Sequence, residues 1–180
     1  MSRWWSGVAG ALAVLVLGAC SGTGMTPTVP TPVFDPLQDP EQVPVLLRQE
    51  IGEDVTVRRV SMTEYGFSAE VRDPKRPENL DDYRFYGGQW ETEPVSVSQY
   101  DIDRLDRTTF RLGAVDWSVI PELERKALAG VDFEQEQVSV ISVDRIEGQG
   151  PRIFIAVQGD RGTGTLVSDA RGRNVEVRRN

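Results

Sequence analysis

The 180-residue sequence predicts an α+β protein built from two tandem repeats, each a helix followed by a small antiparallel sheet. One helical pattern occurs twice, over residues 43–52 and 120–129, and alternating apolar runs follow each copy. An uncharged apolar stretch and a proline-rich stretch precede both copies. The expected organisation is a signal peptide over residues 1–19, a tether over 20–40, the first repeat over 41–98, a linker over 99–115 and the second repeat over 116–180.

The composition excludes several classes of protein. The chain has one cysteine and no histidine, so no internal disulfide, no Cys₄ or Cys₂His₂ zinc site and no Ser–His or Cys–His nucleophile pair can form. The formal net charge of −8 argues against binding to the phosphate backbone of a nucleic acid. We therefore expect a protein that is not an enzyme, uses no metal or cofactor, and does not bind nucleic acid.

The N-terminus has the features of an export signal. Arg3 lies on a short leading segment, and the uncharged stretch over residues 8–17 is about half the ~20 residues that span a bilayer. The residues that follow, Leu17-Gly18-Ala19-Cys20, resemble the lipobox of bacterial lipoproteins. The resemblance implies that a peptidase cleaves before Cys20 and that the cysteine thiol carries a diacylglycerol. The alternative is an ordinary cleaved signal peptide, with Cys20 following it only by coincidence.

A lipid on Cys20 would hold the chain at a membrane of the cell envelope, facing outside the cytoplasm, because two acyl chains give stable anchoring. Five of the eleven prolines lie between residues 21 and 40. Such segments favour extended backbone, so we expect a spacer; a recognition segment for a proline-binding partner is the alternative. Phe34 and Leu37 are the first side chains expected to pack on the folded repeats.

Each repeat opens with an amphipathic helix. Apolar side chains recur at three- and four-residue spacing, and a proline lies in the first turn of both copies. Asp116 is expected to cap the second helix and Gly130 to end it. The apolar positions are Val43, Leu46, Leu47 and Ile51 in the first copy and Ile120, Leu123, Ala127 and Leu128 in the second.

Strands are predicted wherever apolar residues alternate between turns that contain glycine or proline. One helix can cover one face of such a sheet, and each half alone would be marginally stable, so the halves should pack as one unit. The runs are 55–57, 65–71, 83–85 and 95–97 in the first repeat and 138–143, 153–157, 165–167 and 175–177 in the second.

The second repeat resembles a PepSY domain. The likeness rests on the apolar run over residues 152–157 and on the turn formed by Ser168-Asp169-Ala170-Arg171-Gly172. The first repeat departs from the family there, because Gly87-Gly88-Gln89-Trp90 stands in place of that turn. The resemblance implies a binding or inhibitory role, often toward peptidases.

Acidic and aromatic clusters are the remaining candidate sites. Asp101, Asp103 and Asp106 lack the glycine and the late glutamate of a calcium loop, so we interpret them as part of a solvated linker. Trp and Tyr are enriched where proteins dock, although a plain core role is the alternative. The candidate partner-binding residues are Trp90, Tyr86 and Trp117.

Together these features favour a lipid-anchored, non-enzymatic binding module of the cell envelope whose partner is an envelope protein, a peptidase included, or a peptide. One alternative is a carrier of a small molecule or lipid, which requires a large apolar cavity between the repeats. Another is a hydrolase of cell-wall sugars, which requires two carboxylates in a cleft, one of them with a raised pKa.

Overall fold

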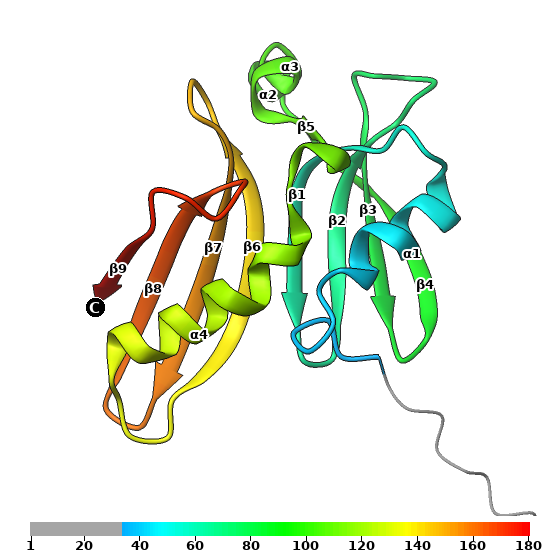
Figure 1. The fold of residues 1–180 in the computed structure, drawn as a ribbon. Helices are drawn as coiled ribbons and strands as arrows, with labels where there is room; N and C mark the ends of the chain where they lie inside the picture. The colour runs from blue at the N-terminus through cyan, green and yellow to red at the C-terminus, as the bar shows by residue number, and fades with distance from the viewer. Residues whose placement is uncertain (1–33) are drawn as a thin grey trace, which may run out of the picture. The chain divides into compact units, whose positions relative to one another are not determined.

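The structure, a computed structural model, describes residues 34–180 (Figure 1). Cys20 and the predicted signal peptide lie outside the described residues. The helical elements are α1 (Gln42–Ile51), α2 (Gln99–Ile102), α3 (Leu105–Thr108), η1 (Leu112–Ala114), η2 (Trp117–Val119) and α4 (Ile120–Val131). The strands are β1 (Thr56–Thr63), β2 (Gly66–Arg72), β3 (Leu80–Tyr86), β4 (Gln89–Val95), β5 (Phe110–Arg111), β6 (Gln137–Ile146), β7 (Gly150–Gly159), β8 (Gly162–Asp169) and β9 (Glu176–Arg179).

The strands form one antiparallel sheet, which confirms the α+β class expected from the sequence. Along the sheet the order is β4-β3-β2-β1-β6-β7-β8-β9, and β5 pairs with the start of β1. Each half of the described chain contributes one longer helix followed by four strands of the main sheet. The first strands of the two halves, β1 and β6, pair with each other, so hairpins extend outward from a central seam in both directions.

The strand register separates an apolar face of the sheet from a polar one. Successive residues of a strand point to opposite faces, so cross-strand partners share a face. α1 and α4 lie across the apolar face, and their buried residues join one core with it (Figure 1). One row of partners on this face is apolar on all eight strands of the main sheet: Trp90, Phe85, Phe67, Met62, Ile141, Ile155, Leu166 and Val177.

The two longer helices lie where the periodic patterns predict them, but the second differs at both ends. Asp116 caps the 3₁₀ turn that leads into α4 rather than α4 itself. The expectation that Gly130 ends this helix is wrong, since α4 stops one residue later, where Asp132 is left-handed with φ 48°. Gly130 instead allows close packing, because a Cβ there would lie 2.8 Å from Val177 of β9.

The fourth strand of the first half also lies elsewhere than expected. The apolar pattern predicts it at residues 95–97, whereas β4 ends at Val95, the first residue of this run, and pairs with β3 along its whole length. Gly87 and Gly88, with φ 58° and 79°, form the tight turn that fixes this pairing. The pattern missed β4 because it is an edge strand with mostly exposed side chains, which need no apolar alternation.

The segment over residues 99–115 is more structured than a solvated linker. It forms α2, α3, β5 and η1, and three of its side chains are buried: Leu105, Phe110 and Leu112. Its acidic residues have local partners. Asp101 caps α2 together with Ser98, and Asp106 pairs with Arg72 at 2.5 Å.

Candidate functional site

Trp90 is part of an aromatic cluster made by Phe34, Phe67, Tyr83, Phe85 and Trp90. The Trp90 ring is half-buried, and its centroid lies 4.9 Å from that of Phe85 and 5.6 Å from that of Phe67. Such spacing is typical of packed aromatic pairs, so most of this ring serves the core. Phe34 packs on the same cluster and Leu37 is buried, so both side chains pack on the fold as expected.

Trp117 is a core residue and not a surface for docking. Its side chain is only 6% exposed, and its Nε1–H donates a hydrogen bond to the carbonyl of Leu112 at 3.2 Å. The buried indole therefore has its polar group satisfied inside the molecule, which is how a core tryptophan is usually held. The prediction that Trp117 binds a partner is wrong for this reason.

Tyr86 is the candidate that the structure leaves at the surface, with 43% of its side chain exposed. Tyr65, at 69% exposed, lies in the turn between β1 and β2, next to Gly66, which pairs with Tyr86. The Tyr86 ring lies close to Gly66, since a Cβ on this glycine would be 2.5 Å from it. Tyr65 and Tyr86 therefore lie on neighbouring hairpins, and we call them the tyrosine pair. Sequence reasoning missed Tyr65 because the alternation placed it inside a strand.

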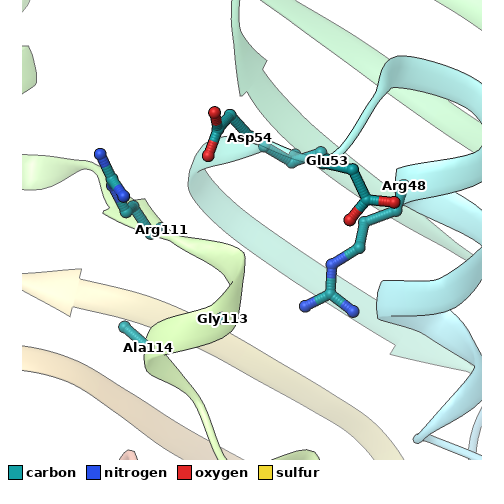
Figure 2. A pocket seen from close by; sticks show the side chains of 7 residues that line it. Arg48, Glu53, Asp54, Arg111, Gly113 and Ala114 are labelled. Atoms are coloured by element: carbon teal, nitrogen blue, oxygen red, sulfur yellow. The ribbon is translucent and has the colours of Figure 1, made fainter.

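A pocket of about 370 Å³, the Arg48 pocket, lies where the end of α1 meets the segment between the two halves (Figure 2). Its position follows from pairing, because β5 adds to the start of β1 and Leu112 N–H donates to the carbonyl of Val55 at 2.9 Å. The pocket is lined by Arg48, Glu53, Asp54, Val55, Arg111, Gly113 and Ala114.

The pocket has two positive and two negative side chains, with one of each on either side. Figure 2 shows Arg48 and Glu53 on one side and Asp54 and Arg111 on the other. None of the four makes an ion pair with another described residue. Arg48 Nη2 lies 3.8 Å from the point where a Cβ on Gly113 would stand. The glycine therefore leaves the guanidinium uncovered on that side.

Arg48 also differs from the other half-buried arginines of residues 34–180. Each of the others has an ion pair or a hydrogen bond with a described residue, and Arg48 has neither. The others are Arg58, Arg72, Arg84, Arg104, Arg145 and Arg152.

A second pocket, of about 340 Å³, lies between the two halves and is rimmed by carboxylates. Glu124 reaches it from α4, and its Oε1 atom is buried with no hydrogen-bond partner in the described chain. Burial, and after it the charge of Asp35, raises the pKa of Glu124 to about 7. In the alignment of the two helical patterns, Glu124 stands in the place of the buried Leu47, so the pattern alone gave no sign of a carboxylate with this property.

The space between helices and sheet is filled rather than open. Buried side chains from both halves form a single core cluster that runs from Leu37 to Ala170. The two pockets described above are open at the surface and lined by both charged and apolar residues. Residues 34–180 therefore do not form the large apolar cavity that a lipid carrier requires.

Comparisons with known proteins bear on the fold. No protein-family model matches the chain, and no curated protein matches it either. The chain is similar to the crystal structure of a provisionally assigned lipoprotein from Clostridium difficile 630. The TM-score is 0.53 at 14% identity, with 76% of this chain and 89% of that chain covered. At this identity the likeness establishes a shared fold. No helix within residues 34–180 is long and apolar enough to cross a membrane.

Replacing Glu124 by Gln should make stability less dependent on pH. The raised pKa means that the folded protein holds this proton up to about pH 7, whereas the unfolded chain releases it near 4.5. Wild-type stability should therefore fall as pH rises from about 4.5 to 7, by about 1–2 kcal/mol after allowance for solvent screening. Urea unfolding of both proteins between pH 4 and pH 8 measures the difference.

Glu122→Gln, on the same helix and ion-paired with Arg125, is the matched control and should not reproduce this trend. Equal pH dependence in wild type and Glu124→Gln would contradict the assignment of Glu124 as a carboxyl group that is costly to ionise.

Proposed function

We propose that the protein is a bacterial lipoprotein, anchored through acyl chains on Cys20 and facing outside the cytoplasm, that acts as a non-enzymatic binding module. The observation that carries the proposal is Leu17-Gly18-Ala19-Cys20 directly after an uncharged apolar stretch. The lipoprotein assignment of the similarly folded Clostridium difficile protein is consistent with it. The anchor needs no membrane-spanning helix, because two acyl chains suffice for stable binding.

The binding role is supported by the architecture and by the exposed aromatics. The order of one helix and four strands in each half is compatible with PepSY-like repeats, whose resemblance implies binding or inhibition of a protein. Tyr65 and Tyr86 are large, exposed and lie on neighbouring hairpins, and tyrosine is enriched at protein interfaces. We infer that the tyrosine pair contacts an envelope protein or peptide.

A Cys20→Ser variant should lose its membrane anchor, because serine cannot form the thioether to the lipid. Wild type should remain in the membrane pellet after a high-salt wash, and its intact mass should match an acylated chain that begins at Cys20. The variant should be recovered unprocessed or in the soluble fraction. Ser21→Ala is the matched control and should behave as wild type. Normal maturation and membrane retention of Cys20→Ser would overturn the proposal.

A Tyr65→Ala, Tyr86→Ala double variant should lose a specific crosslinked partner in intact envelopes. Both side chains are largely exposed, so the fold should be retained, as circular dichroism can verify. The yield of a partner band identified by mass spectrometry should fall about tenfold or more, as expected when interface anchors are removed. Tyr100→Ala, which changes a tyrosine that is 65% exposed elsewhere, is the control. Equal yields from all three proteins would contradict a role for the tyrosine pair.

A second candidate function, the carboxylate-dependent hydrolase, has one specific observation in its favour. Glu124 has a pKa of about 7 and shares a pocket with Asp35, Glu64 and Glu136, and a general acid needs a carboxyl group with such a raised pKa. If this function exists, purified wild type should cleave cell-wall glycan and Glu124→Gln should abolish the cleavage. Absence of turnover in wild type leaves the binding module as the function.

A further inference from the structure

The Arg48 pocket gathers charged side chains of both signs around a half-buried arginine. Four charged side chains line one pocket, yet neither arginine pairs with Glu53, Asp54 or any other described carboxylate. Surface charges elsewhere on the fold do form such pairs, for example Arg59 with Asp144 at 2.6 Å. The half-buried Arg48 guanidinium has donors free for a ligand and is held beside Gly113, which adds no side chain.

We propose that the Arg48 pocket binds a small zwitterion that carries a free carboxylate and a free ammonium group, namely an α-amino acid or a dipeptide. The ligand carboxylate would accept hydrogen bonds from Arg48, whose planar guanidinium suits a carboxylate. The ligand ammonium would face the carboxylate of Asp54 on the opposite side of the pocket.

Charge complementarity favours a zwitterion over a simple anion. Phosphate or acetate at Arg48 would stand in a pocket that also holds two carboxylates, and like charges in one site oppose binding. A molecule with both charges meets a partner of opposite sign at each end. The volume of about 370 Å³ lies at the lower end of the range for small-molecule sites, which limits the ligand to a few residues of peptide at most.

This site is separate from the surface on which the proposed function rests. The pocket lies at the start of β1 and the tyrosine pair at its far end, beyond Thr63. An eight-residue strand is about 26 Å long, so a dipeptide in the pocket cannot reach the tyrosines. The inference therefore stands or falls without the lipid anchor and without a protein partner.

Saturation-transfer NMR with alanylalanine as the probe tests the inference on the mature protein purified in detergent. Wild type should give a saturable transfer signal. N-acetylalanine, which lacks the ammonium, and alaninamide, which lacks the carboxylate, should each bind about tenfold more weakly. Inorganic phosphate should compete poorly.

Arg48→Met keeps the aliphatic stem and removes the guanidinium, so it should weaken binding about tenfold or more. Arg161→Gln, an exposed arginine in the turn between β7 and β8, is the matched control and should bind as wild type. Three results would overturn the inference: no saturable signal in wild type, binding unchanged in Arg48→Met, or phosphate displacing the dipeptide at equal concentration. None of them affects the fractionation or crosslinking outcomes.

Discussion

The pairing of β1 with β6 is the interaction on which the rest of the structure depends. Each half has one longer helix and four strands, too little apolar surface for a stable core of its own. Pairing the two first strands aligns Met62 with Ile141 and Val60 with Val143, so the apolar rows of both halves become continuous. A register slip of one residue at this seam would turn one half's apolar side chains toward the opposite face.

The same seam explains where the two pockets lie. Because β1 and β6 are both central, the chain must travel from the outer edge at β4 back to α4, and it does so along residues 96–116. On the way it adds β5 to β1, which places Arg111 and Gly113 beside the end of α1 and forms the Arg48 pocket. The Glu124 pocket lies at the junction itself, lined by α4 and β6 on one side and the turn near Asp35 on the other.

Sequence reasoning could predict the elements that carry periodic apolar residues, and it failed where tertiary contacts decide. The helices around Leu47 and Leu123 and most of the central strands follow from spacing alone. The edge strand β4 has no apolar alternation because its side chains are mostly exposed, so its position depends on the Gly87-Gly88 turn. Gly130 looked like a helix end, whereas the reason for a glycine is the approach of Val177, which lies 47 residues later in the chain and cannot be read from local sequence.

The candidate sites show the same division. A sequence does not show whether an aromatic side chain is exposed or buried. Only the packing in the structure shows that Tyr86 is exposed and that Trp117 is buried. Arg48 and Arg111 are 63 positions apart, and no pattern links them before β5 pairs with β1. In the sequence Glu124 is one of 28 acidic residues, and only the burial of its Oε1 atom in the structure distinguishes it. Residue types were therefore visible in the sequence, while the environments that give them chemistry were not.

The two proposed surfaces lie at opposite ends of β1 and have different surroundings. Phe34 packs on Phe67 and Phe85, which lie at the end of the sheet that carries the tyrosine pair. The Arg48 pocket lies about 26 Å away along β1. A small ligand could then enter it without displacing a partner bound at the tyrosine pair, which is the arrangement expected if the two surfaces bind independently.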